Sequence, residues 1–217
     1  MTDIRNIMDG FRDGHHEFEN GHLESFEGVD PFELFNLWTK EAVANEELEP
    51  NAFVLSTVSS DGQPSSRILY LKDIIESKLV MYTNYNSLKG QQIEQNGKVN
   101  MLFFWPKSSR QIRIQGICSK VPDEISDAYF ASRPRGSQIG AWASNQSELL
   151  SNREELEKRV NSFEAEFPNE VPRPEHWGGY WVKPTQFEFW QGRPSRLHDR
   201  IVFKSNQSDW KIERLNP

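Results

Sequence analysis

A hydrophobic period of two runs through the middle of the sequence. Apolar and polar residues alternate, or apolar residues form short runs, over 52–59, 65–72, 78–83, 99–105 and 111–121. The turn Ser60-Asp61-Gly62 joins the first two segments into a hairpin. Three more segments of strand character follow at 180–191, 197–204 and 210–215. Because neighbouring strands joined by short turns pair in opposite directions, the sequence predicts a mainly antiparallel sheet.

Helices are predicted before and between these strands. Asp30 is a good N-cap and Pro31 suits the first helical position, so 31–47 is predicted to be an amphipathic helix. Further helices are predicted over 88–96, 123–132 and 147–167, the last with Leu149, Leu156 and Val160 on its buried side. Regular strand–helix alternation and a GxGxxG sequence are absent, which disfavours a doubly wound dinucleotide-binding sheet. The expected fold class is α+β, mainly antiparallel β, built on a small barrel with flanking helices.

The length of 217 residues suits one domain, which we place at residues 30–217. Residues 1–30 carry eight carboxylates against Arg5 and Arg12. Such a segment solvates itself, so we expect residues 1–29 to form an acidic and mobile N-terminal segment.

Composition excludes several classes of function. A net charge of −7 disfavours a nucleic-acid partner, although a locally cationic pocket could still bind a small phosphorylated ligand. The longest purely apolar run, over 101–105, is far shorter than the roughly 20 residues that span a bilayer, so no membrane partner is expected. A single cysteine, Cys118, excludes an internal disulfide framework, and the N-terminus lacks a signal peptide. The cytoplasm is therefore the expected location.

A zinc motif is incomplete in this sequence. His16-Glu17 begins like HExxH, but Asn20 occupies the position of the second histidine. His15, His16 and His22 lie in the acidic N-terminal segment, where we expect solvated side chains rather than a metal site. We therefore expect no metal.

Cationic residues in the predicted strands form the first candidate site. Arg67 and Lys72 flank an apolar run, and strict alternation would place them on opposite faces of the strand. The alternative is that they are two ordinary surface charges. Ser87 and Lys89 open a predicted helix, where free backbone N–H groups, a hydroxyl and an ammonium could hold a phosphate. The alternative is a serine N-cap beside a solvated lysine.

A second candidate lies near the C-terminus. In a strand, Arg196, His198 and Arg200 would share one face, with Trp190 close in sequence. Three such groups repel one another unless an anion neutralises them, and histidine can exchange a proton with a substrate. The alternative is an exposed edge strand whose charges pair with acids elsewhere. A basic, turn-rich loop is also expected over 133–138.

Several short motifs, in one order along the chain, resemble the pyridoxamine 5′-phosphate oxidase family. The resemblance runs from about Asp30 to the C-terminus, and its motifs are residues 67–72, 82–84, 87–89, 132–142, 145–147, 177–179, 188–192, 196–200 and 214–217. It implies an FMN-binding split β-barrel that works as a homodimer, with two FMN sites at the subunit interface. It also implies an enzyme that oxidises pyridoxamine or pyridoxine 5′-phosphate to pyridoxal 5′-phosphate with O₂, releasing H₂O₂, and ammonia from the amine.

The resemblance implies a role for individual residues as well. The residues expected to bind FMN are Arg67, Ile68, Leu69, Tyr70, Leu71, Lys72, Tyr82, Thr83, Ser87, Lys89, Gln111, Gln146, Ser147, Trp190 and Arg200. The residues expected to bind the phosphorylated pyridine substrate are Lys72, Tyr129, Arg133, Ser137, Arg196, Leu197 and His198. Arg196 and His198 are the expected catalytic residues, flanking the pyridine ring.

Two positions depart from the family pattern. Leu88 stands where family members usually have an arginine beside the phosphate, and Gly14-His15-His16-Glu17 replaces an arginine and a tyrosine that close over the substrate. An alternative is therefore a related flavin oxidase that acts on another substrate, such as a dihydrophenazine. A third possibility is a non-catalytic flavin-binding barrel, which the Arg196 and His198 pair disfavours because storage of FMN needs no titratable group.

Overall fold

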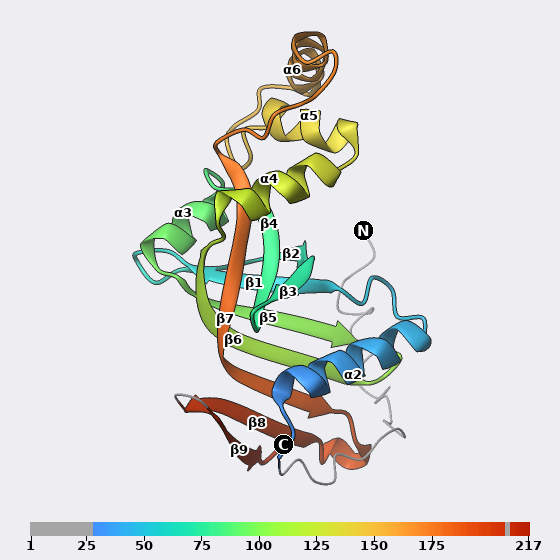
Figure 1. Cartoon of the computed structure of the whole chain (residues 1–217). Coiled ribbons are helices and arrows are strands. Elements are labelled where there is room, and N and C mark those ends of the chain that lie inside the picture. The colour runs from blue at the N-terminus through green and yellow to red at the C-terminus, as the bar shows by residue number, and fades with distance from the viewer. Residues whose placement is uncertain (1–27, 207–208) are drawn as a thin grey trace, which may run out of the picture. The chain divides into compact units, whose positions relative to one another are not determined.

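The computed structural model describes residues 28–206 and 209–217, which group into two compact units (Figure 1). The central unit comprises Glu49–Phe103 and Arg113–Phe187, and the terminal unit comprises the described residues up to Leu48, Phe104–Ile112 and Glu188–Pro217. The predicted mobile segment 1–29 lies almost wholly outside the described residues, and the single domain over 30–217 stays a prediction.

Most strands and helices of the central unit were predicted within a few residues. In chain order its elements are β1 (Ala52–Val58), β2 (Pro64–Tyr70), β3 (Asp73–Ile75), β4 (Lys78–Asn84), α3 (Leu88–Gln95), β5 (Lys98–Trp105), β6 (Arg110–Lys120), α4 (Asp123–Ser132), α5 (Arg135–Ala143), α6 (Arg153–Glu166) and β7 (Trp177–Gln191). β5, β6 and β7 also contribute residues to the terminal unit.

The sheet confirms the predicted α+β class. Its strands follow the order β2-β1-β5-β6-β7-β4-β3, and antiparallel registers join β1 to β2, β1 to β5, β3 to β4 and β4 to β7. Alternation decides which side chains enter the core: Phe53, Leu55 and Thr57 of β1 are buried, whereas their neighbours in the strand are only half-buried. Phe53 packs on Phe103 of β5 with ring centroids 5.3 Å apart.

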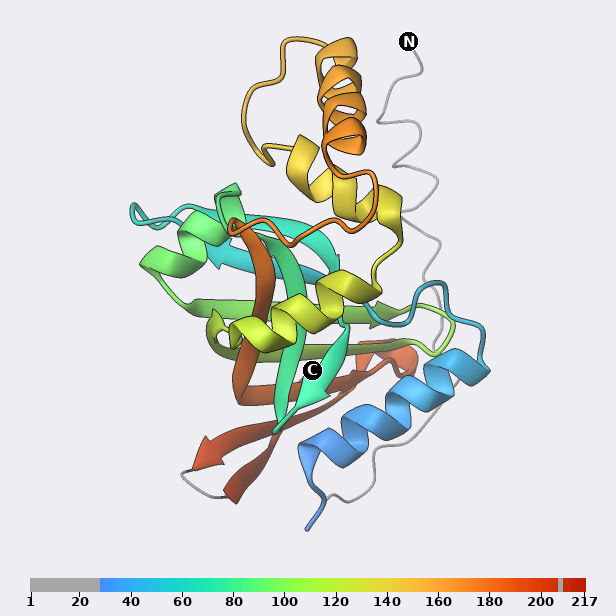
Figure 2. The ribbon, with the colours of Figure 1, turned by 45° about the horizontal axis from the view of Figure 1, so that its top comes forward.

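A smaller apolar cluster lies under the helices of the central unit. Phe130 of α4, Ile139 and Ala141 of α5, Val171 and Trp177 form its buried part. α5 and α6 lie side by side in Figures 1 and 2, and Trp142 of α5 contacts two phenylalanines of the α6 segment. This cluster holds α4 and α5 in place at the β4 and β7 side of the sheet.

The structure corrects three of our predictions about the elements. The stretch expected as a basic loop over 133–138 is mostly the first half of α5, which begins directly after Pro134. The long helix begins at Arg153 rather than at 147, because Asn152 is its N-cap, and Leu149 is fully exposed in the preceding loop. β3 was not predicted, since three residues are too few to show a period.

The terminal unit combines α2 (Pro31–Ala44), η1 (Pro194–Arg196), β8 (Asp199–Asn206) and β9 (Asp209–Leu215), and β8 pairs with β7 and β9. As predicted, Asp30 caps α2 and accepts a hydrogen bond from Phe32 N–H at 2.8 Å. Trp38 of α2 meets Phe189 edge to face at 5.2 Å, and Phe189 meets Phe203 in the same way at 5.6 Å. None of the described helices combines the length and apolar character needed to cross a bilayer.

Candidate functional site

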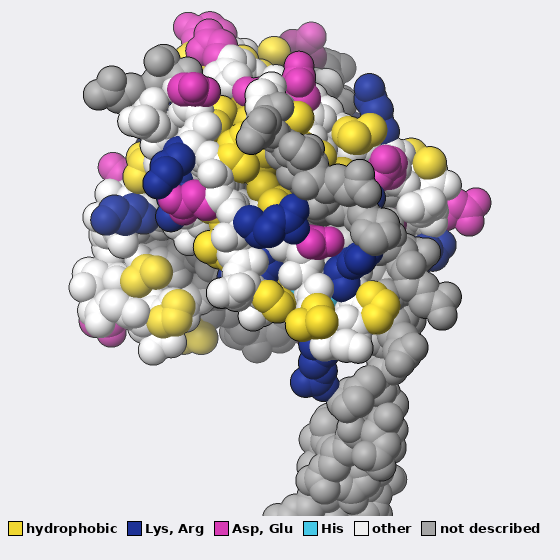
Figure 3. All heavy atoms as spheres, turned by 90° about the horizontal axis from the view of Figure 1, so that it is seen from below, with side chains coloured by type: hydrophobic (Ala, Val, Ile, Leu, Met, Phe, Trp, Pro, Cys, Tyr) yellow, Lys and Arg dark blue, Asp and Glu magenta, His cyan; other side chains and the backbone are white. Residues whose placement is uncertain are grey.

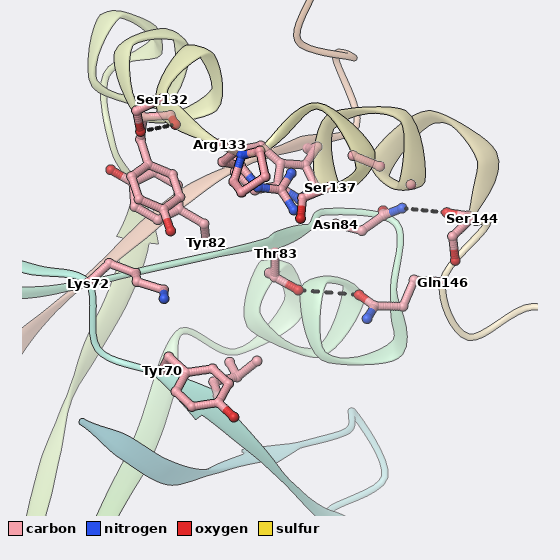
Figure 4. Close-up of a pocket in the computed structure, with 16 residues that line it drawn as sticks. Tyr70, Lys72, Tyr82, Thr83, Asn84, Ser132, Arg133, Ser137, Ser144 and Gln146 are labelled. Atoms are coloured by element: carbon pink, nitrogen blue, oxygen red, sulfur yellow. Dashed lines mark hydrogen bonds between the residues drawn. The ribbon is translucent and has the colours of Figure 1, made fainter. Parts of the chain in front are cut away.

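A cavity of about 780 Å³ lies in the central unit, where β2 and β4 face α4 and α5 (Figure 4). The end of β2 contributes Tyr70 on one side, and the α4–α5 segment contributes Arg133 and Ser137 on the other. The cavity brings together nine residues of the predicted site: Leu69, Tyr70, Lys72, Tyr82, Thr83, Tyr129, Arg133, Ser137 and Gln146.

Lys72 reaches the cavity because β2 ends before it. The strand stops at Tyr70, and the backbone N–H of Lys72 bonds to Val80 O of β4 at 2.9 Å. Because Lys72 lies beyond the end of β2, the alternation of side chains along the strand does not determine where Lys72 points. Its side chain can therefore line the cavity. Its ammonium lies 5.1 Å from the centroid of the Tyr70 ring.

Stacked aromatic rings form one wall of the cavity. Tyr82 and Tyr129 lie 3.8 Å apart and nearly parallel, and Trp177 lies 5.6 Å from Tyr82 in the same orientation. Burial, with smaller contributions from Tyr129, Asp73 and Tyr85, raises the pKa of Tyr82 to about 12. Its hydroxyl therefore stays protonated near neutral pH and remains a hydrogen-bond donor.

Arg133 places an unsatisfied cation on this wall. Its guanidinium lies 4.4 Å from the Trp177 ring centroid, and its buried Nη1 has no hydrogen-bond partner among the described residues. Burial lowers the pKa of Arg133 from its ordinary value. Because a buried donor without an acceptor costs about 1–3 kcal/mol, this nitrogen favours an anionic ligand.

Lys89 is buried at the start of α3 among neutral oxygens. Its ammonium donates to Thr83 Oγ1 at 3.2 Å, to Ser87 Oγ at 3.2 Å and to Gln146 Oε1 at 3.0 Å. Ser87 also caps α3 by accepting from Gly90 N–H. Burial, and secondarily repulsion from Arg67, lowers the pKa of Lys89 to about 8. The predicted phosphate cradle is thus a buried cluster, unlike the solvated lysine of the alternative.

No carboxylate neutralises these cations within the described chain. The cavity lining contains Lys72 and Arg133 but neither Asp nor Glu, and no described acid forms an ion pair with Arg67 or Lys89. Elsewhere cations lie close to acids, and both signs of charge are interspersed on the face in Figure 3. Cations that no acid neutralises are suited to bind one or more phosphate groups. A flavin mononucleotide and a phosphorylated substrate would each supply such a group.

The predicted catalytic residues lie in the terminal unit. His198 packs on Trp190 with ring centroids 4.6 Å apart, and its Nδ1 accepts a hydrogen bond from Arg193 N–H at 3.1 Å. Burial and the charge of Arg196 lower the pKa of His198, which favours the neutral ring. Because Nδ1 accepts a hydrogen bond, the proton of the neutral ring lies on Nε2.

The strand-face argument for these residues is wrong. β8 begins at Asp199, whereas Arg196 lies in the η1 turn with a φ of 60° and His198 lies between the two elements. Arg200 is in the strand, but it forms an ion pair with buried Glu188 at 2.8 Å. For Arg200, the alternative prediction of a charge paired with an acid is therefore the correct one.

The remaining predicted residues have mixed positions. Arg67 donates a hydrogen bond to Thr57, and Ser87 accepts one from Lys89, but neither residue lines the cavity. Ile68 and Leu197 are largely exposed, and Leu88 is half-exposed at the first position of α3. Leu71, Ser147, Gln111, Trp190 and Arg200 do not line the cavity. Gly14-His15-His16-Glu17 and His22 lie outside the described residues. The expectation that these histidines bind no metal therefore stays a prediction.

Sequence reasoning assigned no role to several lining residues, among them Asn84, Ser144 and Trp177. The motif at 177–179 carried the signal for Trp177. The next residue, Gly178, has no room for a side chain, because a Cβ there would lie 2.1 Å from the Tyr85 hydroxyl. Ser144 carried no local signal, since it reaches the cavity only through the unpredicted α5.

Comparison with known proteins identifies the family of this chain. Residues 39–166 match the family model described as pyridoxamine 5′-phosphate oxidase, and residues 177–217 match a pyridoxine 5′-phosphate oxidase C-terminal dimerisation region. A pyridoxine/pyridoxamine 5′-phosphate oxidase from Leptospira biflexa is 53% identical over 89% of this chain and 92% of its own. One from Trichormus variabilis is 48% identical over 87% and 89%.

Solved structures confirm the predicted FMN-binding split-barrel fold. PhzG from Burkholderia lata, in complex with tetrahydrophenazine-1-carboxylic acid, is 28% identical with a TM-score of 0.86 over 93% of this chain and all of its own. A pyridoxamine 5′-phosphate oxidase-related, FMN-binding protein from Nostoc punctiforme is 16% identical with a TM-score of 0.70 over 88% and 100%. The cation-lined cavity thus lies in a chain that belongs to the pyridoxamine 5′-phosphate oxidase family.

Proposed function

We propose that this protein is an FMN-dependent oxidase that converts pyridoxamine or pyridoxine 5′-phosphate to pyridoxal 5′-phosphate. One observation carries the proposal: a cavity with an aromatic wall is lined by Lys72 and Arg133 and by no carboxylate, in a protein whose net charge is −7. The names of relatives about half identical over most of the chain support the same substrate.

FMN is held by its phosphate and its ring system in this proposal. Arg67 and Lys89 bind the phosphate, and Ser87 and Thr83 hold the ammonium of Lys89 in place. The backbone and side chains of 68–72, with Tyr82, Gln111, Gln146, Ser147, Trp190 and Arg200, contact the rest of the cofactor. Bound FMN would supply the hydride acceptor for the substrate C4′ carbon, and O₂ would reoxidise it with release of H₂O₂.

The substrate phosphate binds to the cationic side of the cavity. Lys72 and Arg133 neutralise its charge, while Tyr129 and Ser137 donate hydrogen bonds that fix its orientation. The open Nη1 of Arg133 gains an acceptor when the phosphate arrives. This grip holds the pyridine ring at a constant place relative to the rest of the site, which is the main contribution of the protein to the rate.

Arg196 and His198 act on the reacting end of the substrate. Arg196 orients the pyridine ring for hydride transfer. His198, neutral and hydrogen-bonded through Nδ1, receives or relays the proton that leaves the amine or the hydroxyl. Leu197 would contact the ring between them.

We further propose that the enzyme acts as a homodimer with its FMN sites at the subunit interface. The match of residues 177–217 to a dimerisation region supports a dimer. Trp190, Arg196, His198 and Arg200 all lie within this region.

A second candidate function is oxidation of a reduced phenazine. PhzG, which matches nearly the whole chain, was solved with tetrahydrophenazine-1-carboxylic acid, and Leu88 departs from the usual oxidase pattern. A phenazine carboxylate carries one carboxylate and no phosphate. It would leave at least one of Lys72 and Arg133 without an anion, so the phosphorylated pyridine is the better fit.

The deciding experiment mixes purified holoprotein with pyridoxamine 5′-phosphate without oxygen and follows loss of the flavin absorbance. Rapid bleaching, with pyridoxal 5′-phosphate as product, is expected. Pyridoxamine without its phosphate is the control and should bleach the flavin much more slowly at equal concentration. Bleaching by a dihydrophenazine carboxylate but not by pyridoxamine 5′-phosphate would instead establish the second candidate.

A further inference from the structure

A chain of hydrogen bonds with a buried centre joins β2, β1 and α3. Arg67 Nη1 donates to Thr57 Oγ1 at 2.6 Å, and Thr57 Oγ1 donates to Gln92 Oε1 at 2.5 Å. Gln92 Nε2 then donates to Ser65 Oγ at 3.1 Å. The side chains of Thr57 and Gln92 are 0% and 4% exposed, so this chain has no solvent to replace its partners.

The direction of each bond follows from the chemistry of its end groups. The carbonyl oxygen of Gln92 can only accept, so it takes the single proton of the Thr57 hydroxyl. The Thr57 oxygen then presents lone pairs, which is what a guanidinium requires. Gln92 therefore makes Thr57 an acceptor for Arg67.

Strand register explains why Thr57 can hold Arg67. Thr57 lies opposite Ser65 and Leu55 opposite Arg67 in the antiparallel β1–β2 pair, so Thr57 is the diagonal neighbour of Arg67. The Arg67 guanidinium also donates to Leu55 O, at a longer 3.3 Å. Two acceptors on β1 thus restrict the side chain to the inner face of the hairpin.

Helix α3 connects this chain to Lys89. Lys89 and Gln92 are three residues apart, which places both side chains on one side of the helix, and both are buried. Arg67 and Lys89 repel each other electrostatically, since the charge of Arg67 contributes to the lowered pKa of Lys89. A guanidinium free to rotate would move away from that ammonium.

We propose that Thr57 and Gln92 are positioning residues, which hold the Arg67 guanidinium beside the Lys89 ammonium so that the two cations bind one phosphate monoester. This inference rests on the proposed function, in which that monoester belongs to FMN. Neither residue touches the ligand. The alternative is that the chain only stabilises the packing of α3 on the hairpin.

The test compares FMN with riboflavin, which has the same ring system but lacks the phosphate. Apoprotein is titrated with each flavin for the wild type and the Thr57→Val and Gln92→Leu variants. We expect the Kd for FMN to rise about tenfold in both variants, and the Kd for riboflavin to stay within about twofold. Thr57→Ser keeps the hydroxyl and should restore wild-type affinity for FMN. Ser56→Ala is the matched control, because Ser56 makes a hydroxyl contact to Ser66 on the opposite face of the same strands.

A double-mutant cycle with Arg67 separates positioning from packing. Thr57→Val should weaken FMN binding no further in an Arg67→Ala background, since the group it positions is already missing. Equal losses for FMN and riboflavin, or additive losses in the cycle, would overturn the inference. If Gln92→Leu does not fold, the isosteric Thr57→Val and its Thr57→Ser rescue decide the question alone. Wild-type protein that binds FMN no better than riboflavin would contradict the proposed phosphate cradle itself, a separate result.

Discussion

Cations with neutral partners distinguish the candidate site at the scale of single residues. Lys89 is surrounded by two hydroxyls and an amide oxygen, whereas Arg200 of the terminal unit has buried Glu188. A charge held by neutral groups remains available to a ligand, because no internal acid competes for it.

Lys72→Ala should raise the KM for pyridoxamine 5′-phosphate by about ten- to a hundredfold and change kcat by less than about twofold. A cation that grips the phosphate does so equally before and during hydride transfer, so its loss appears in KM. Steady-state kinetics measure both constants. Lys78→Ala is the control, since Lys78 is ion-paired with Glu76 and does not line the cavity. A collapse of kcat at saturating substrate would assign Lys72 a different role.

Lys89 should make FMN binding take up protons. Its folded-state pKa of about 8 lies below its ordinary value of 10.5, so between these values the unfolded chain binds more protons and apoprotein stability rises with pH. A bound phosphate dianion favours the charged ammonium and reverses this shift. Titration calorimetry at about pH 8.5, in two buffers of different ionisation enthalpy, counts the protons. Lys89→Met should abolish the uptake, and an identical count in both proteins would contradict the prediction.

At the scale of elements, the start of α3 depends on a glycine. A Cβ at Gly90 would lie 2.0 Å from Tyr85 O, so the helix and the preceding turn approach too closely for any side chain. This contact lets Ser87, Lys89 and Gln92 follow β4 within a few residues.

Gly90→Ala should therefore destabilise the apoprotein by about 2 kcal/mol or more, although alanine normally stabilises a helix interior by about 1 kcal/mol. Gly136→Ala on α5 is the control, since a Cβ there meets nothing within 4 Å. It should be neutral or slightly stabilising. Chemical denaturation of both apoproteins gives the comparison, and equal effects would mean that the Tyr85 turn yields without cost.

Elements with a strong local period were predictable, and those defined by packing were not. β6 alternates clearly, β5 is a nearly continuous apolar run, and Asp30-Pro31 marks the start of α2 by capping chemistry alone. α5 was missed because Pro134 and Gly136 suggest a turn, although proline also favours a position just before or at the first turn of a helix.

The same limit applies to the candidate site. Ser87 and Lys89 carried a local signal, because a helix N-terminus can be recognised from the sequence. Arg133, Ser137 and Tyr129 entered only through the family resemblance, since the fold of α4 and α5 against β4 brings them to the cavity. Thr57 and Gln92 gave no signal as a pair, because 35 residues separate them and only the tertiary structure joins them.

At the scale of the whole molecule, the residues of the predicted site are distributed over both units of the chain. Lys72 belongs to the central unit and His198 to the terminal unit, within the region matched to dimerisation. We predict that in the proposed dimer one subunit supplies Lys72 to each site and the other subunit supplies His198.

Mixing two defective variants tests this arrangement. Lys72→Ala and His198→Ala proteins are unfolded together, refolded as mixed dimers and assayed at low substrate concentration. Random pairing should restore about one quarter of the wild-type sites, because each mixed dimer regains one intact site. The same proteins mixed without unfolding form the control and should show no gain. Absence of any gain after refolding would mean that Lys72 and His198 of one subunit serve the same site.

The acid-free lining also has a consequence for the kinetics of ligand encounter. A doubly charged phosphate ester approaching from solution first meets a molecule of net charge −7, and only within about 10 Å of the cavity does the attraction of its cations dominate at ordinary ionic strength. Added salt screens the outer repulsion and the inner attraction alike. Screening of the outer repulsion speeds association, and screening of the inner attraction speeds dissociation. Both rate constants therefore rise with ionic strength, and the equilibrium constant changes less than either of them.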